Sequence, residues 1–306
     1  MANDGMAYTE EQQSLDAAIG RAAAFMTTGQ NIVFFTGAGA SAESGIQTFR
    51  GNSGLWQRFP PETYGTLRGL AWVAAVTPWK LAAFLREIVG SFVGAQPNHC
   101  HRAIADFQQN AGMKTITVVT QNVDDLHQEA GSSPERVIEL HGSLLNWSCL
   151  WCLTERKFTK AELVEETREL MKDGWVVWRA ITGQCLPRCA KCKGIMRPDV
   201  VLFGESLPIL SLERAKSLCK DANCVVIVGT SGCVQPASLL PGYAKEMNGA
   251  KIIEVNPARK EFECSDIWLR GTATEVLPAL IASTRSRVGM FDTVIDIQKR
   301  RQKRDQ

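Results

Sequence analysis

Short polar side chains gather where two apolar stretches of the sequence end. The stretch 118–124 reads Val-Val-Thr-Gln-Asn-Val-Asp and delivers Asn122 and Asp124, and the stretch 136–140 leads into His141. An amide, a carboxylate and an imidazole at neighbouring strand ends can orient a polar substrate and accept a proton. A lone histidine is more often a hydrogen-bonded structural residue, but its place at a strand end before a glycine makes the catalytic interpretation equally strong.

Two cysteine pairs of the CxxC type follow this polar cluster, and 36 residues lie between them. Two such pairs are typical of tetrahedral zinc, with free thiols or a redox pair as the alternatives. The insert 153–188 exceeds the 15–20 residues of a compact ribbon and must loop out. Four thiolates leave no open position for water, so the metal would hold the fold, and Cys185 offers a spare ligand. The expected ligands are Cys149, Cys152, Cys189 and Cys192.

A glycine-rich stretch follows the first apolar run of the chain. The run 31–36 is nearly all apolar, and the stretch 37–42 reads Gly-Ala-Gly-Ala-Ser-Ala, which has the form G-x-G-x-x-G/A. This pattern predicts a buried strand that turns into a helix whose N-terminus receives a pyrophosphate. On spacing alone, a plain glycine-rich turn is an equal alternative. The acidic residue typical of dehydrogenases is missing from 51–61, which favours a use of the dinucleotide other than hydride transfer.

The loop 43–51 is suited to fold over such a ligand. Arg50 can reach a phosphate, and Phe49 can shield a reactive sugar from water. For a lone arginine, the alternative is a solvated surface residue.

Alternating helical and apolar stretches place these groups in an α/β fold. Apolar residues at helical spacing predict a packing helix over 9–28, and several helical stretches, notably 78–92, fall within 52–112. Strands that each end in glycine, serine or asparagine predict a rim for a dinucleotide at the carboxyl edge of a parallel sheet. The expected strands are 31–36, 114–119, 136–140, 224–228, 251–255 and 267–269.

The composition is that of an ordinary globular protein with two domains. The chain has 306 residues, of which 45% are hydrophobic and 22% charged, and its net charge is +2. This balance does not indicate nucleic acid, and a peptide or small molecule fits better. We expect cytosol or nucleus and no membrane partner, because neither a targeting segment nor a membrane-spanning run is apparent. The basic stretch 299–304 is expected to be a solvated end rather than a nuclear import signal.

The motifs together resemble those of the sirtuins, the NAD-dependent protein-lysine deacylases. The resemblance covers most of 31–280 and rests on GAGASAESGIQTFRG, TQNVDDLH, the His141-Gly142 pair, both CxxC pairs, FGE, GTSGCVQPA and EVN. The sequence motifs LHGSL and RPDVVLFGE are most similar to those of class III, which includes human sirtuin 5 and its bacterial relatives. The resemblance implies a Rossmann-like parallel sheet with helices on both faces, plus a smaller zinc-ribbon and helical module.

The same resemblance implies a domain plan and a cleft in which NAD and acyl-lysine meet. The target is an acylated lysine in a peptide or protein, which includes histone tails. A mitochondrial location joins the expected ones. The domains are an N-terminal helix at 1–30, a Rossmann-like NAD-binding domain at 31–50, 113–143 and 198–285, a helical insertion at 51–112, a zinc-binding module at 144–197 and a basic tail at 286–306.

Roles for single residues also follow from the resemblance. His141 would be the general base that accepts a ribose hydroxyl proton after the acyl oxygen has attacked C1′, and Asp124 would hold the nicotinamide carboxamide. Asn122 joins them as a catalytic residue. The residues around NAD would be Gly37, Ala38, Gly39, Ser41, Phe49, Arg50, Trp56, Gln121, Asn122, Asp124, Gly229, Thr230, Ser231, Asn256 and Ala273. Those that meet the substrate would be Leu85, Ile88, Phe203, Gly204, Glu205 and Val234.

Two departures from the family pattern bear on the function. Gln47 stands where proline is usual, which would loosen the cofactor loop. Leu85 and Ile88 take the places of the tyrosine and arginine that bind an acidic acyl group, so we expect acetyl or crotonyl to be favoured over succinyl or malonyl. If the alignment shifts, Arg86 is the alternative carboxylate partner.

Two other functions remain to be weighed. The same fold could transfer ADP-ribose to protein, because both reactions begin at C1′. The chain could also be a zinc-containing binding module without catalysis, but the joint presence of His141, Asn122 and Asp124 speaks against this.

Overall fold

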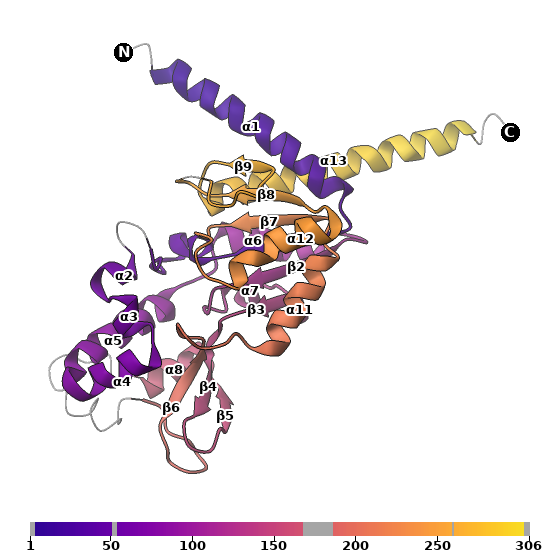
Figure 1. Ribbon diagram of the computed structural model, residues 1–306. Helices are drawn as coiled ribbons and strands as arrows, with labels where there is room; N and C mark the ends of the chain where they lie inside the picture. The colour runs from indigo at the N-terminus through magenta and orange to yellow at the C-terminus, as the bar shows by residue number, and fades with distance from the viewer. Residues whose placement is uncertain (1–3, 51–53, 168–185, 259, 303–306) are drawn as a thin grey trace.

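A six-stranded parallel sheet forms the centre of the larger domain (Figure 1). The computed structural model describes residues 4–50, 54–167, 186–258 and 260–302. The strand order is β3-β2-β1-β7-β8-β9, and every neighbouring pair is parallel. The strands are β1 (Asn31–Thr36), β2 (Thr115–Thr120), β3 (Val137–Glu139), β7 (Cys224–Val228), β8 (Lys251–Val255) and β9 (Ile267–Leu269).

Helices cover both faces of this sheet because its central strands are apolar on both sides. In β1, Phe34 belongs to one core cluster and Phe35 to the other. The first cluster contains residues of α1 (Asp4–Thr28), α6 (His99–Gln109) and α13 (Ala273–Gln302). The second contains residues of α11 (Ile209–Lys220) and α12 (Leu240–Asn248). Buried side chains on both faces are the mark of a parallel sheet, so the predicted fold class is confirmed.

The smaller module joins two parts that are distant in the sequence. Its helical part consists of α2 (Leu55–Arg58), α3 (Pro61–Tyr64), α4 (Leu67–Val76) and α5 (Pro78–Gly94). Its ribbon is an antiparallel sheet with the strand order β5 (Glu155–Lys157), β4 (Gly142–Cys149) and β6 (Met196–Val200). Helix α8 (Lys160–Glu166) follows β5 in the chain. Phe92 of α5 packs into the apolar cluster of the ribbon with Trp147 and Phe158, which holds the two parts together.

The predicted helix after β1 is wrong. Residues 38–44 form two short 3₁₀ turns, η1 (Ala38–Ala40) and η2 (Ala42–Ser44), and Gly45 ends them with a φ of +88°. The reason is a tertiary contact, because the amide of Gly39 donates to the carbonyl of Gly229 at 2.8 Å. This bond ties the backbone to the loop after β7, so the turn does not propagate as an α-helix.

Two further regions differ from the sequence analysis. Helix α6 lies inside the predicted insertion 51–112, yet it packs on the large sheet through Ile104 and Phe107. The tail expected as a disordered, solvated end is helical as far as Gln302, because Lys, Arg and Gln are good helix formers and no glycine or proline falls within 290–302. Figure 1 shows the free ends of α1 and α13 projecting from the domain. Cys185 and residues 303–306 lie outside the described residues.

Candidate functional site

The loops that follow β1 and β7 touch each other at three glycines. The amide of Gly37 donates to the carbonyl of Val228 at 3.0 Å. A Cβ on Gly39 would lie 2.7 Å from Cα of Gly229, and Gly229 itself has a φ of +59°. Side chains are excluded here by backbone packing. The glycines therefore serve the fold directly, and they leave bare backbone at the carboxyl edge, where α/β sheets bind their ligands.

Polar side chains from β2, β7 and β8 extend this rim. The side-chain amide of Gln121 donates to the hydroxyl of Thr230 at 2.9 Å, and the side-chain amide of Asn256 donates to the backbone carbonyl of Thr230 at 3.3 Å. Ser231 is half-buried beside them. Ala273 is buried in the core and begins α13, so only its backbone is suited to meet a ligand.

A buried hydrogen-bond network holds the residues that lie deepest at this edge. Ser41 donates to Oδ2 of Asp124 at 2.6 Å and accepts from Nδ2 of Asn122 at 3.0 Å. Asp124 also accepts from the amide of Leu126 at 3.1 Å. Burial raises the pKa of Asp124, and these two hydrogen bonds offset that increase in part. Asn122 and Asp124 are therefore fixed in orientation by Ser41.

Two buried histidines support this network, and the sequence analysis assigned neither of them. Nδ1 of His101 accepts from the amide of Asn98, so Nε2 carries the proton and faces Ser41 at 3.3 Å. Burial lowers the pKa of His101 to about 4 and that of His127 far below its usual value, and their rings are 4.8 Å apart. Both are neutral, so they position hydroxyl groups without adding charge. The motif TQNVDDLH contained His127, but no local pattern marked His101.

His141 has the geometry of a general base. Its Nδ1 lies 2.9 Å from the backbone carbonyl of Gln121, which can only accept, so Nδ1 carries the proton. Nε2 is buried and has no hydrogen-bond partner among the described residues. Burial lowers the pKa of His141, and the bond to Gln121 opposes this shift only in part. The ring is therefore neutral at pH 7, with its Nε2 lone pair open to a substrate proton.

The glycine after His141 is required by the ribbon. Gly142 has a φ of +77°, and a Cβ there would lie 1.8 Å from the carbonyl oxygen of Asp199 in β6. The carbonyl of His141 accepts from the amide of Val201 at 3.0 Å. The end of the large sheet and the beginning of the ribbon are thus joined at the catalytic candidate itself.

A pocket of ≈ 60 Å³ opens between the large sheet and α5. Ala38, Asn122 and Asp124 lie on its sheet side, which brings three residues predicted to surround NAD into one wall. The remaining lining is mainly apolar and comes from the loop after β1, from α2 and α5, and from the start of the ribbon. These residues are Ile46, Gln47, Phe49, Leu55, Glu87, Ile88, Ser91, Phe92, Val123 and Leu144.

Of the two residues predicted to read the acyl group, only Ile88 lines the pocket. Leu85 is not among the lining residues, although both side chains pack against the same apolar cluster of the helical module, which includes Phe84. The sequence analysis also missed Glu87, which lines the pocket next to Ile88.

Glu87 belongs to a polar cluster at this pocket. Gln47 donates to Glu87 at 2.9 Å, and Arg58 donates to Gln47 at 3.1 Å. Arg58 also forms an ion pair with Glu87. Gln47, which stands where proline is usual in the cofactor loop, therefore links that loop to α5. We call these three residues the Arg58 cluster.

Aromatic side chains connect the loop after β1 to the predicted peptide segment. Phe49 stacks on Trp56 with 5.2 Å between ring centroids, and Trp56 lies 5.9 Å from the ring of Phe203. The amide of Trp56 donates to the carbonyl of Phe49 at 3.1 Å, which closes the loop. Arg50 is exposed next to Phe49, so its side chain is accessible to a phosphate.

The segment predicted to meet the substrate peptide is exposed. Phe203 and Gly204 are exposed, and Val234 is half-buried. Arg197 holds both carboxylate oxygens of Glu205, at 2.8 and 3.0 Å, and these bonds lower the pKa of Glu205. The Glu205 side chain is thus engaged within the chain, and the amides of Phe203 and Glu205 donate to the carbonyls of Gly65 and Leu202 at 2.7 and 3.0 Å.

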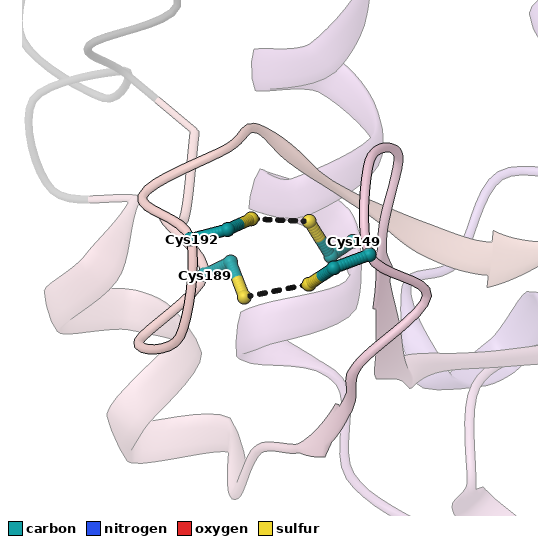
Figure 2. A group of neighbouring side chains, drawn as sticks. Cys149, Cys189 and Cys192 are labelled. Carbon is teal, nitrogen blue, oxygen red and sulfur yellow. Dashed lines mark hydrogen bonds between the residues drawn. The ribbon is translucent and has the colours of Figure 1, made fainter.

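The four predicted cysteine ligands converge in the ribbon. Their Sγ atoms all lie within 4.8 Å of one another, and Figure 2 shows Cys149 facing Cys192, at 3.4 Å. Cys152 and Cys189 are 3.5 Å apart. These separations exceed a disulfide bond of about 2.05 Å. They are close to the separation of about 3.8 Å that zinc–sulfur bonds of about 2.3 Å impose in a tetrahedron.

Backbone amides complete the cysteine cluster. The amide of Trp151 donates to Sγ of Cys149 at 3.4 Å, and the amide of Gly194 donates to Sγ of Cys192 at 3.4 Å. Such bonds stabilise thiolates and orient them towards a metal. The donor set fits a tetrahedral zinc ion closed to water.

Comparisons with known proteins agree with this arrangement. Residues 37–236 match the model of the Sir2 family. A relative from Thermococcus kodakarensis named NAD-dependent protein deacylase is 39% identical over 270 residues, which cover 86% of this chain and 94% of the relative. Another from Aquifex aeolicus with the same name is 42% identical over 260 residues, 85% of this chain and 97% of the relative.

Two solved structures show similar folds with ligands. A Sir2 homologue in complex with NAD has a TM-score of 0.71 and 35% identity, and the match covers 87% of this chain and 93% of that one. Sir2Af2 bound to a myristoylated histone peptide has a TM-score of 0.66 and 31% identity, and the match covers 90% of this chain and 99% of that one.

Proposed function

The chain belongs to the Sir2 family and is an NAD-dependent protein deacylase, and from that premise we propose that it removes uncharged acyl groups, such as acetyl or crotonyl, from lysine. The observation that carries the catalytic assignment is the state of His141. Its Nδ1 is anchored on Gln121, and its buried Nε2 lacks a partner within the described chain. A base that is neutral and desolvated at neutral pH is suited to accept a hydroxyl proton.

The residues at the sheet edge fit NAD. When bound, NAD supplies an electrophilic ribose carbon, C1′, to which the acyl oxygen of the substrate can add as nicotinamide leaves. Asn122 and Asp124 would hold the nicotinamide end, because both line the pocket and are fixed by Ser41. Bare backbone at Gly37 and Gly229 would accommodate phosphates. His141 would accept the proton of a ribose hydroxyl at Nε2.

We also propose that the cysteine cluster holds one structural zinc ion. Cys149, Cys152, Cys189 and Cys192 would supply four thiolates, and the spacing of their sulfurs supports this assignment. The ion would stabilise the ribbon that begins at Gly142, directly after His141, and would take no part in the reaction.

The preference for uncharged acyl groups rests on the pocket. Ile88, Phe92 and Leu144 give it an apolar lining, and its acidic lining residues are Glu87 and Asp124. An acidic acyl group would lose water and meet a like charge, while the only cation of the Arg58 cluster is already paired with Glu87. Desuccinylation and demalonylation, the alternative for class III, are therefore disfavoured.

The peptide would bind as an added strand. Phe203 and Gly204 are exposed next to the aromatic contact of Phe203 with Trp56, so an extended peptide has access to this segment. The histone peptide bound by the similar Sir2Af2 supports histone tails as one kind of substrate.

A panel of peptides tests this proposal. Acetyl-, crotonyl-, malonyl- and succinyl-lysine versions of one peptide are incubated with NAD, and nicotinamide release is measured. We expect faster release with acetyl and crotonyl. Faster release with succinyl would overturn the acyl preference and leave the deacylase assignment intact. Labelled NAD distinguishes transfer of ADP-ribose, because label would then remain on protein instead of on a small O-acyl-ADP-ribose.

A further inference from the structure

Helix α4 (Leu67–Val76) exposes an apolar face. Of its residues, only Val73 is fully buried. Trp72 is 58% exposed and Val76 is 52% exposed, and Ala71 and Ala75 are exposed beside them. The outer face of a surface helix is normally charged or polar. Figure 1 shows α4 at the lower end of the helical module, away from the large sheet.

The residues on either side of this helix face add to it. Leu67, at the start of α4, is 51% exposed, and Trp79, in the first turn of α5, is 52% exposed. Single exposed apolar residues are ordinary on protein surfaces. Four large ones within 67–79 are a concentration of exposed apolar side chains that is typical of a binding surface.

The charges within this segment and at its ends are positive. Arg68 and Lys80 are exposed at its two ends. The stretch 63–86 contains no aspartate or glutamate. The acids on either side of this stretch are Glu62, which is exposed in α3, and Glu87, which lines the pocket and is paired with Arg58. The apolar segment itself therefore carries cations and no acid.

We propose that this surface, formed by Leu67, Trp72, Val76 and Trp79 with Arg68 and Lys80, binds the surface of an anionic lipid bilayer. Tryptophan is favoured at the boundary between headgroups and acyl chains. Apolar side chains on one helix face bury themselves in that boundary, and nearby cations are attracted by anionic headgroups. Between Arg68 and Lys80 the exposed side chains offer few hydrogen-bonding groups, whereas a protein partner would usually require a polar rim.

Peripheral binding of this kind needs no membrane-spanning helix. In the described part of the chain, none of the helices is long and apolar enough to cross a bilayer. The expectation of no membrane partner rested on the absence of such a run, but an interfacial helix is recognised by an apolar face and nearby cations and not by the length of an apolar run.

Vesicle flotation with the full chain tests the proposal. We expect binding to vesicles of phosphatidylcholine with phosphatidylglycerol and little binding to phosphatidylcholine alone. The double change Trp72→Ser with Trp79→Ser should lower the bound fraction by about 10-fold or more, since two apolar anchors are lost. Each of Arg68→Gln and Lys80→Gln should lower it by about fivefold, and added salt should do the same.

A matched control uses an exposed apolar residue elsewhere on the molecule. Leu210 is 86% exposed in the first turn of α11, so Leu210→Ser should leave vesicle binding unchanged. All variants should keep their nicotinamide release with a soluble acetyl-lysine peptide, which shows that they are folded. Three outcomes would overturn the proposal. The double variant could bind vesicles as well as the unmodified protein does, or the unmodified protein could bind uncharged vesicles as well as anionic ones. The unmodified protein could also bind no vesicles and instead form a dimer, detected by light scattering, that the double change abolishes. The last would make this face an interface between two copies.

Discussion

The carboxyl edge of the large sheet and the Arg58 cluster hold their functional side chains in different ways. At the edge, Ser41, Asn122 and Asp124 are buried and bonded to one another. In the cluster, the Arg58 side chain is 53% exposed and its ion pair lies at the surface. Losing a partner in a buried network costs about 1–3 kcal/mol, whereas an exposed ion pair contributes about 0–1 kcal/mol. The residues for the reaction thus lie at the sheet edge, where a substitution strongly destabilises the protein. The residues proposed to select the acyl group lie in the Arg58 cluster, where a substitution costs little stability.

The largest effect is expected at the sheet edge. His141→Ala should lower the rate of deacylation by ~100-fold or more, because a general base is lost. The folded protein should still bind NAD, which titration calorimetry can measure. His99→Ala is the control, since His99 is exposed at the start of α6 and should be replaceable without effect. Near-normal turnover by a folded His141→Ala protein would remove this residue from the mechanism.

The pH dependence of the rate tests whether His141 at the sheet edge is desolvated. Burial lowers the pKa of His141 below its usual value of 6.5. The base is active when neutral, so activity is present above its pKa and is lost as the pH falls through that pKa. The midpoint of the decrease in rate should therefore lie below pH 6.5. A midpoint at or above 6.5 would contradict a desolvated His141.

The cysteine ribbon provides the next largest effect. Cys192→Ser should remove the metal, which metal analysis would show as a fall from about one zinc per chain to none. Deacylation should fall ~10-fold or more, because disturbing even the supporting residues of a metal site has effects of that size. Cys233→Ser is the control, since Cys233 is also exposed but is not part of the cluster. Full activity in metal-free protein would show that the ribbon does not need zinc.

Much of the large sheet could be predicted because its strands are short apolar runs that end in small or polar residues. The predicted limits 31–36, 224–228, 251–255 and 267–269 coincide with β1, β7, β8 and β9. Strand β2 is displaced from its prediction by one residue, a usual uncertainty at element ends. The 3₁₀ turns could not be predicted, because they depend on the contact between Gly39 and Gly229, which only the folded sheet creates.

The site was predicted in the same uneven way. The convergence of the four cysteine sulfurs is confirmed, because CxxC pairs carry their geometry in local spacing. His101 and the Arg58 cluster were missed, because their partners are distant in the sequence. Arg58 and Glu87 are 29 residues apart and meet only when α2 and α5 pack together. No helical or strand periodicity encodes such a pairing.

A smaller effect is expected in the Arg58 cluster. Glu87→Gln removes the like charge that faces an acidic acyl group and frees Arg58 from its ion pair. We expect the rate with succinyl-lysine, relative to acetyl-lysine, to rise by about fivefold, which corresponds to about 1 kcal/mol for a partly exposed charge. Glu62→Gln removes an exposed acid of α3 in the same module and serves as the control. An unchanged ratio would mean that Glu87 does not contribute to the acyl preference.

The smallest effect concerns an acid at the end of β3. Glu139 accepts a hydrogen bond from Gln128 at 2.9 Å and lies close to Asp125, which is buried and bonded to Ser143. Burial, and then the charge of Asp125, raise the pKa of Glu139 from 4.5 to about 7. Two carboxyl groups in one partly buried site favour a shared proton over two charges.

Because the folded pKa exceeds the unfolded one, the native state binds more protons than the unfolded state between pH 4.5 and about 7. The contribution of Glu139 to stability is therefore complete below 4.5 and is lost as the pH rises through about 7. Glu139→Gln has no such titration, so its free energy of unfolding, measured with urea, should gain on that of the unmodified protein as the pH rises through this range. Glu263→Gln, at an exposed position, should follow the unmodified protein throughout. If the free energy of unfolding of Glu139→Gln runs parallel to that of the unmodified protein at every pH, Glu139 is hydrated like the surface carboxylates of the smaller module. Glu139 would then not belong to the buried part of the sheet edge, whose nearest buried acid would be Asp125.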